Sequence, residues 1–235
     1  MNQSALERIA KSVQPLIREH PLPGTPYSIG GTGFLVGFRG RSFVVTCRHA
    51  MNTGPLVPLC FFVDDHSQDL VPLQAVTQVP PSIAPDDWAD IALIEVDMQA
   101  AVGSKAGRAV LIDIERASIG WQDFRDTSKF VLLGYPNEKS FIEYDDQLIH
   151  SQLVTLRGAY AGPTESTSVH VMRLDDTDDL TSLSGFSGGM VLSWVERPGI
   201  LPQFAFCGLA IQGTVASRSA RFIEAELILH ALSVW

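Results

Sequence analysis

The sequence predicts an all-β protein, folded as one domain or as two small half-domains that share an interface, and three observations point to this class. From Ser28 onward the 235-residue chain consists of short segments rich in Val, Leu, Ile and Phe, separated by Gly, Pro, Asp and Ser at fairly regular spacing. Helical periodicity is confined to the two ends, and the chain has no internal repeat, low-complexity tract or linker. Such a succession of short strands is typical of a sandwich or of a pair of barrels.

The first stretch, residues 1–22, has the pattern of a helix and linker. Apolar residues recur at helical spacing, which predicts an amphipathic helix that ends near His20 with a kink at Pro15; they are Leu6, Ile9, Ala10, Val13, Leu16 and Ile17. Three prolines and a glycine, Pro21, Pro23, Gly24 and Pro26, then stop the helix. We expect its apolar stripe to pack on the rest of the domain, and docking of a partner is the alternative.

The strands follow in order along the rest of the chain. They are expected at GTGFLVGF, SFVVTC, LVPLCFFV, LVPLQAVT, IALIEVD, RAVLIDI, KFVLLGY, QLVTLRG, SVHVMRL, GGMVLSW and FAFCGLAIQG. The stretch from Gly103 to Asp126 is the expected seam between two halves. The final segment, residues 226–235, regains helical spacing and is expected to cap the domain as a helix.

Composition and charge exclude several classes of function. Hydrophobic residues make up 46% of the chain and charged residues 18%, which is typical of a globular protein and excludes intrinsic disorder. The net charge of -9 would repel phosphate backbones and anionic membranes, so neither a nucleic-acid nor a membrane partner is expected. The same charge favours neutral or cationic partners, or it serves solubility alone.

The cysteines and the N-terminus bear on metals and compartment. Cys47, Cys60 and Cys207 are odd in number and lie inside apolar runs, so they are expected to be free core thiols. No CxxC pair, HExxH helix or His/Cys cluster is present, and no metal or other cofactor is expected. The N-terminal residues do not have the pattern of a secretory signal, and no run approaches the roughly 18 apolar residues of a membrane span. A reducing, cytoplasmic setting is therefore expected.

Three residues interrupt the strand pattern at positions suited to chemistry. His49 follows the strand FVVTC, although a lone histidine there is usually a packing or capping residue. Asp90 stands immediately before IALIEV, where an aspartate is commonly a turn residue. Ser187 lies among Gly185, Gly188 and Gly189, and three glycines in five residues indicate a tight turn whose backbone closely approaches another group.

Together the three side chains meet the requirements of acyl transfer. A serine hydroxyl needs an imidazole to accept its proton, and the imidazole needs a carboxylate to hold the right tautomer. The carbonyl oxygen that becomes negative must meet preorganised donors, and the amides of Ser187 and Gly185 are suitably placed in the sequence. Each requirement has one candidate.

The segments GTGFLV, VVTCRHA, DIALIEV and GFSGG resemble the trypsin/chymotrypsin family in chain order and approximate spacing, from Gly31 to Ala225. The resemblance implies two six-stranded antiparallel β-barrels, here residues 28–115 and 128–225, with the active site between them. It implies a serine endopeptidase acting on a protein or peptide, with His49 as general base, Asp90 as its orienting carboxylate and Ser187 as nucleophile. The amides of Gly185 and Ser187 would form the oxyanion hole.

Two departures from the family pattern modify this expectation. The disulfide that digestive members have next to the histidine cannot form, because Ala50 follows His49 and Cys47 precedes it by two. Phe186 stands where those members have an Asp that captures a newly cut N-terminus, so activation by N-terminal cleavage is not expected. The chain looks like intracellular bacterial members of the family, which other domains, regulatory partners or loop ordering hold in check.

The resemblance also implies where the substrate binds. The floor of the main specificity pocket would be Thr181, with Ser182 beside it, and would suit a small or medium side chain. If the loop register differs by two, Asp179 would face a basic side chain, and a solvated acidic loop is the alternative. Main-chain groups of Ile211, Gln212 and Gly213 would pair with an extended peptide.

Two rival interpretations remain. Residues Gly185 to Gly189 also match the G-x-S-x-G elbow of α/β-hydrolases, but that fold needs a helix after the serine, and GGMVLSWV has the pattern of a strand. The other rival is a protease fold that has become a binding or scaffolding module, which a collapsed oxyanion loop would favour. His66, His150 and His170 lie at strand ends and in loops without partnering motifs, so they are interpreted as structural.

Overall fold

The computed structural model describes residues 3–20, 24–51, 59–62, 70–73, 77–78, 90–96, 110–118, 120–146, 148–197 and 200–234. Strands dominate these residues, and the described helices are short. No helix among them is long and apolar enough to cross a membrane.

The first half of the chain pairs its strands into one sheet. Its strands are β1 (Val13–Glu19), β2 (Tyr27–Phe38), β3 (Arg41–Cys47), β4 (Leu59–Phe62), β5 (Leu70–Leu73), β6 (Thr77–Gln78), β7 (Ile91–Glu95) and β8 (Ile112–Asp113). They pair in the order β5-β4-β1-β2-β3-β7-β6, and β8 joins β2. Within the described residues, the half therefore has six longer strands and the two-residue strands β6 and β8.

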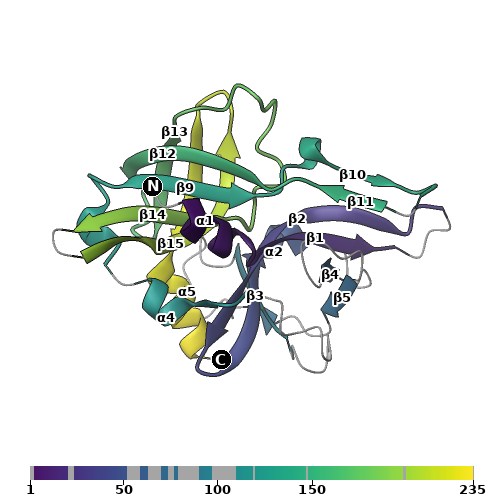
Figure 1. The fold of residues 1–235 in the computed structure, drawn as a ribbon, viewed down its shortest axis with the longest axis horizontal. Helices are drawn as coiled ribbons and strands as arrows, with labels where there is room; N and C mark the ends of the chain where they lie inside the picture. The colour runs from purple at the N-terminus through teal and green to yellow at the C-terminus, as the bar shows by residue number, and fades with distance from the viewer. Residues whose placement is uncertain are drawn as a thin grey trace.

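The second half forms a closed barrel and a separate hairpin. The barrel strands are β9 (Lys129–Gly134), β12 (Val154–Pro163), β13 (Val169–Leu174), β14 (Met190–Arg197), β15 (Ile200–Thr214) and β16 (Ser219–Glu224). They close in the order β12-β13-β16-β15-β14-β9. The hairpin consists of β10 (Ser140–Glu143) and β11 (Leu148–Ser151), and it extends away from the barrel alongside β1 and β2 (Figure 1). The all-β class expected from the sequence is confirmed.

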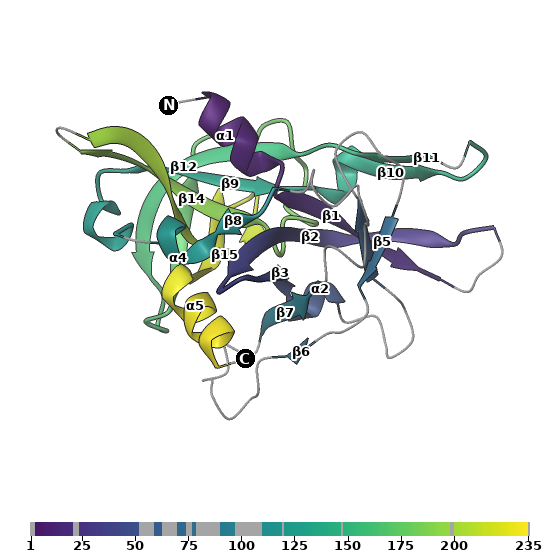
Figure 2. The ribbon, with the colours of Figure 1, turned by 60° about the horizontal axis from the view of Figure 1, so that its bottom comes forward.

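Short helices join or cover the two halves. They are α1 (Gln3–Ala10), α2 (Arg48–Met51), α4 (Ile114–Ala117), α5 (Ala225–Ser233) and the 3-10 turns η4 (Gln122–Phe124) and η5 (Asn137–Lys139). Figure 2 shows α1 across the barrel and α4 together with α5 on another side of the molecule. The expected seam between the halves is described in part, because residues 101–109 and 119 lie outside the described residues.

The expected N-terminal helix is wrong beyond Ala10. Residues Val13–Glu19 form strand β1, which pairs with β2 along its whole length. The apolar spacing misled because β1 lies between β2 and β4 and is buried on both faces, so that Leu16 and Ile17 are both buried but pack in different apolar clusters. Pro15 also disfavours a continuous helix here, because proline cannot donate the hydrogen bond that a helix interior needs.

One large apolar cluster joins the two halves. It contains Phe34 and Val45 of the first sheet together with Phe130, Phe206 and Phe222 of the barrel, all fully buried. The rings of Phe34 and Phe206 meet edge to face with their centroids 5.4 Å apart. The core is thus continuous across the boundary, and it holds the facing loops of the two halves in a fixed relation.

Candidate active site

His49 and Asp90 come together because the strands next to them are paired. β3 ends at Cys47 and β7 begins at Ile91, and these two residues are antiparallel partners. His49 lies two residues beyond Cys47 in α2, and Asp90 lies one residue before Ile91, so both lie at the same end of the strand pair. His49 Nδ1 is 2.7 Å from one carboxylate oxygen of Asp90, and the backbone N of His49 donates to the other at 2.9 Å.

This contact fixes the ring and changes its acidity. The hydrogen bond to Asp90 is the main cause that raises the pKa of His49 above its ordinary value of 6.5, and the negative charge of Asp90 acts in the same direction against burial. The imidazole is 49% exposed, whereas the Asp90 side chain is 26% exposed. One nitrogen of the ring is therefore held by the carboxylate while the ring remains accessible.

Cys47 lies beneath this pair. Its side chain is fully buried, and Sγ donates to the carbonyl oxygen of Ala210 at 3.1 Å. Burial raises the pKa of this thiol well above its usual value, and the nearby charge of Asp90 raises it further. The thiol is thus a neutral donor beside Asp90 rather than a thiolate.

Cys47, His49 and Asp90 also offer three possible metal-ligating atoms within 4.8 Å of one another, the one such group among the described residues. A metal ion would have to replace the 2.7 Å contact between His49 and Asp90 and remove the proton of a buried thiol. The arrangement therefore fits hydrogen bonding better than metal coordination.

Ser187 reaches the same place from the barrel. Gly188 N donates to the carbonyl of Ala210 at 2.8 Å, and Ala210 N donates to the carbonyl of Gly189 at 2.8 Å. The carbonyl of Ala210 thus accepts hydrogen bonds from Cys47 of the first sheet and from the residue next to Ser187. This one carbonyl joins the strand end that carries His49 to the loop that carries Ser187.

Gly31 provides a second junction. Its φ is +131°, and a Cβ at this position would stand 3.2 Å from the Cβ of Ala50 and 3.2 Å from the carbonyl oxygen of Ser187. Only glycine leaves room for both neighbours in this backbone conformation. The residue after His49 and the backbone of Ser187 therefore both lie close to Gly31.

The hydroxyl of Ser187 donates to the carbonyl of Ile211 at 3.2 Å. Among the hydrogen bonds of the described residues there is none between Ser187 and His49. Such contacts are often long in the absence of substrate and tighten only when substrate binds.

The N–H groups of Gly185 and Ser187 point away from the donors that bind the carbonyls of the preceding residues. The carbonyl of Ser184 accepts from Asn137 N at 2.9 Å, and the carbonyl of Phe186 accepts from Gly189 N at 2.8 Å. In a trans peptide the N–H points opposite to the carbonyl, so the next N–H groups, those of Gly185 and Ser187, point away from these partners. No hydrogen bond within the described part of the chain uses either N–H. Both are available as donors.

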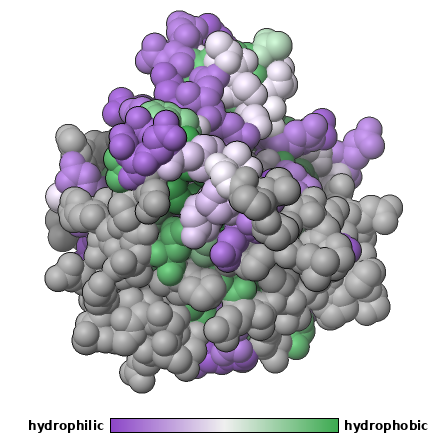
Figure 3. Space-filling view, turned by 90° about the vertical axis from the view of Figure 1, so that its right-hand side faces the viewer, coloured by the Kyte–Doolittle hydropathy of each residue, from purple (hydrophilic) through white to green (hydrophobic). Residues whose placement is uncertain are grey.

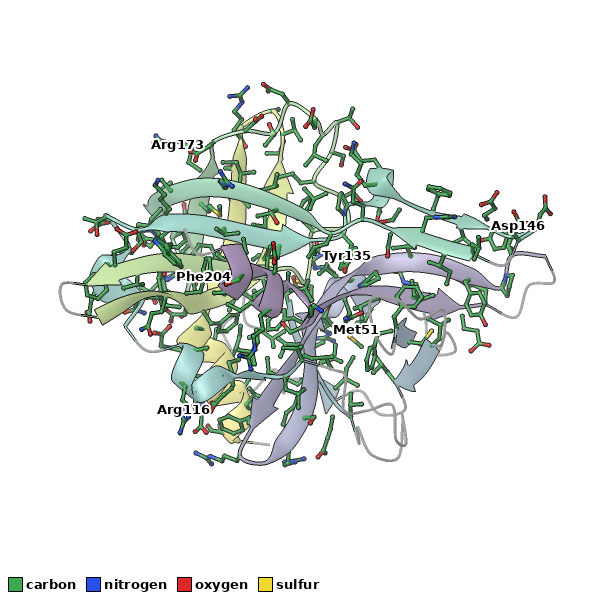
Figure 4. The ribbon with its side chains drawn as sticks, viewed as in Figure 1. Met51, Arg116, Tyr135, Asp146, Arg173 and Phe204 are labelled. Atoms are coloured by element: carbon green, nitrogen blue, oxygen red, sulfur yellow. The ribbon has the colours of Figure 1, made fainter. Side chains whose placement is uncertain are left out.

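Thr32 of β2 holds this loop from the first half. Its hydroxyl donates to the carbonyl of Gly185 at 2.7 Å and accepts from Tyr135 N at 2.8 Å. Its own N donates to the carbonyl of Ser187 at 3.0 Å. Figure 4 labels Tyr135 in the middle of the molecule, where the two halves meet. Thr32 is fully buried, so this connection is shielded from water.

The residues expected to bind substrate lie around the same loop. Thr181 and Ser182 are exposed, and Thr181 contacts the carboxylate of Glu138. Ile211 is partly exposed, and Gln212 and Gly213 are exposed near the end of β15. Asp179 is exposed, and its neighbour Asp178 accepts a hydrogen bond from Arg218 at 2.8 Å.

The other titratable side chains expected to be structural lie apart from this loop where they are described. His170 is buried, with Nδ1 2.9 Å from the Tyr160 hydroxyl and Nε2 3.2 Å from Glu224. His150 stacks on Phe141 in the hairpin. His66 lies outside the described residues. Cys47, Cys60 and Cys207 are all free and buried, as expected from the sequence.

Three features of this site are not apparent from the sequence: the role of Thr32, the role of Glu138, and the contact of Cys47 with Ala210. Each involves a partner far away in the chain. The signal that could have found Thr32 is its place between Gly31 and Gly33, since small neighbours indicate a close approach of another backbone. No local pattern marks Glu138.

Comparisons with known proteins bear on the fold. No protein-family model and no curated protein matches the sequence. Solved structures do match, and one is the thermostable serine protease AL20 from an extremophilic microorganism. It has a TM-score of 0.58 and 12% sequence identity, and the match covers 95% of this chain and 96% of that chain. At this identity the likeness is one of fold: the closed six-stranded barrel and the further sheet of this chain are consistent with a trypsin-like double-barrel fold.

Proposed function

We propose that this protein is a serine endopeptidase that cleaves peptide bonds through an acyl-enzyme intermediate. The observation that carries the proposal is the His49–Asp90 pair, held at 2.7 Å on the same junction as Ser187. The available amides of Gly185 and Ser187 support it, because an activated serine without oxyanion donors is a poor catalyst.

The chemistry follows from these groups. His49 accepts the proton of Ser187 as Oγ attacks the substrate carbonyl, and Asp90 stabilises the imidazolium that forms. The amides of Gly185 and Ser187 donate to the carbonyl oxygen as it becomes negative. His49 then gives its proton to the leaving amine as the peptide bond breaks, and the acyl group stays on Ser187. His49 next takes a proton from a water molecule that attacks the acyl carbon, and it returns the proton to Ser187 Oγ as the acid leaves. We further propose that Thr181 and Ser182 line the specificity pocket and that Ile211, Gln212 and Gly213 pair with the peptide backbone.

The three free thiols support a reducing compartment such as the cytoplasm, where disulfides do not persist. A protein or peptide is the proposed substrate. A regulatory protein partner would act on the loop that carries Gly185 and Ser187.

A second candidate is a protease fold that binds without cleaving. One observation favours it: the Ser187 hydroxyl donates to the carbonyl of Ile211 and not to His49. A serine held in that rotamer is not activated.

Covalent labelling tests the proposal. The purified chain, Ser187→Ala and His49→Ala would be treated with a fluorophosphonate probe and analysed by intact mass. We expect one adduct on the wild type alone, because the reaction needs both the nucleophile and the base. Folded protein that gains no adduct and cleaves no peptide from a mixed library would contradict an active serine and favour the binding module.

A further inference from the structure

The loop from Thr181 to Ser187 carries the nucleophile and both proposed oxyanion donors. Asn137 and Glu138, in the segment after β9, form hydrogen bonds with this loop. Asn137 makes two contacts with Ser184: its backbone N donates to the Ser184 carbonyl at 2.9 Å, and its side-chain Nδ2 donates to the Ser184 hydroxyl at 2.9 Å. The first of these bonds sets the plane of the 184–185 peptide, and therefore the direction of the Gly185 N–H.

Glu138 forms hydrogen bonds with the start of the same loop. Its carboxylate accepts from Thr181 N at 3.0 Å and 3.1 Å, and it also accepts from the Thr181 hydroxyl and the backbone of Ser182. The hydrogen bond from the Thr181 hydroxyl is the main cause that lowers the pKa of Glu138, so the acceptor is an anion at neutral pH. Hydrogen bonds to an ionised acceptor are stronger than those between neutral groups.

Apolar anchors hold the rest of the loop. Leu183 and Phe186 are buried in the core, with Phe186 against Gly134 and Leu183 against Gly213. A Cβ on Gly134 would stand 2.7 Å from the Phe186 ring, and one on Gly213 would stand 2.7 Å from Leu183. The loop is also closely packed between these anchors and the Glu138 contact, because a Cβ on Gly185 would stand 2.6 Å from the backbone N of Asn137.

We propose that Glu138 is a positioning residue that keeps the loop from Thr181 to Ser187 in the arrangement that binds the oxyanion. This inference rests on the proposed peptidase function and concerns the same site. Glu138 acts through the backbone of Thr181 and Ser182, and Asn137 carries the effect to the peptide between Ser184 and Gly185. The chain thus orders its own oxyanion loop through an internal carboxylate.

The test compares Glu138→Ala and Glu138→Gln with the wild type and with Glu143→Gln. Glu143 is a matched control, because it is an exposed carboxylate of the adjoining hairpin whose described partner is His150. Peptide cleavage gives kcat and KM, and fluorophosphonate titration gives the fraction of active protein. A peptide boronic acid, which forms a tetrahedral adduct with the serine, reports on the oxyanion donors.

We expect Glu138→Ala to lower kcat and boronate affinity by about 10-fold to 100-fold, because loss of one oxyanion donor lowers kcat by about 10²–10³-fold. Glu138→Gln should fall between, since its amide oxygen still accepts one hydrogen bond, and Glu143→Gln should match the wild type.

The proposal is overturned if Glu138→Ala keeps the kcat of Glu143→Gln. It is also overturned if the variant only lowers the titratable fraction while the remaining fraction has wild-type rate constants, because Glu138 would then support folding alone. A wild type that neither labels nor cleaves would contradict the peptidase function itself, and this inference with it.

Discussion

Replacing Thr32 by valine would remove the hydroxyl that ties the two halves together at the proposed oxyanion loop. Valine has nearly the same shape, so the change deletes two hydrogen bonds without opening a cavity: the one to the carbonyl of Gly185 at 2.7 Å and the one from Tyr135 N at 2.8 Å. Thr32 is fully buried, so water does not replace the lost partner.

The size of the effect follows from these two bonds. A buried carbonyl left without a donor costs about 1–3 kcal/mol, and loss of the bond from Tyr135 adds about 1 kcal/mol. The expected loss in the free energy of unfolding is therefore about 2–4 kcal/mol, out of a total of about 5–15 kcal/mol for a typical protein. With a urea m-value of about 3 kcal/mol/M, the unfolding midpoint falls by about 1 M.

Urea unfolding followed by tryptophan fluorescence measures this loss, with Thr32→Ser as the control that keeps the hydroxyl. The rate of fluorophosphonate labelling should also fall in Thr32→Val, because the Gly185 peptide is no longer held. Equal midpoints and equal labelling rates for the valine and serine variants would refute the role assigned to this hydroxyl.

Three further predictions concern the acid, the thiols and a glycine. Activity should rise with pH through the pKa of His49, because the ring must be neutral to accept a proton. Asp90 raises this pKa above 6.5, so Asp90→Asn should move the midpoint of the pH profile of kcat/KM to lower pH. The same variant should lower kcat by about 10⁴-fold. The three thiols should resist alkylation by iodoacetamide at pH 8 until urea is added, because Cys47, Cys60 and Cys207 are all buried. Burial also raises the pKa of Cys60 to about 12, so little of its thiolate is present at that pH. Rapid alkylation of the folded protein would contradict this. Gly188→Ala should lower the free energy of unfolding by more than about 3 kcal/mol, because φ is +88° and a Cβ would stand 1.8 Å from the Thr32 carbonyl oxygen. Gly40→Ala is the control: φ is +78° but the space around it is open, so the loss in the same thermal melt should be only about 1–2 kcal/mol.

The strands were predictable because their signal is local. Segments such as KFVLLG and MVLSWV are apolar runs bounded by turn residues, and they form β9 and β14. The strand after Ser187 also excludes the α/β-hydrolase elbow, which needs a helix there. The candidate residues His49, Asp90 and Ser187 could be singled out for the same reason, since each interrupts a strand pattern in its own short segment.

What could not be predicted depends on the place of a strand in its sheet and on distant partners. Leu16 and Ile17 follow helical spacing in the sequence, and only the place of β1 between β2 and β4, with both faces covered, explains why two neighbours are buried in a strand. Thr32 contacts residues more than 100 positions away, and Glu138 contacts a residue 43 positions away. Such pairings follow from the topology of the whole sheet, which a single sequence does not display.

The surface around the hairpin differs from the core. Figure 3, which faces the hairpin end of the molecule, shows hydrophilic side chains over much of its upper part. Phe141 is 59% exposed there, and Figure 4 labels Asp146 at the hairpin's outer tip. The hairpin is therefore solvated over much of its length, although Ile149 packs against an apolar cluster of the first sheet.

The proposed proton acceptor and the proposed nucleophile belong to different halves of the molecule, and the carbonyl of Ala210 is a shared point of attachment. The distance between them is therefore set by how the halves dock and not by the folding of either half. A displacement of about 1 Å between reacting groups lowers a rate by about 10²-fold. The relative position of the two halves thus controls the rate of the proposed reaction. A ligand that moved the halves apart or held them together would change that rate without contacting His49 or Ser187.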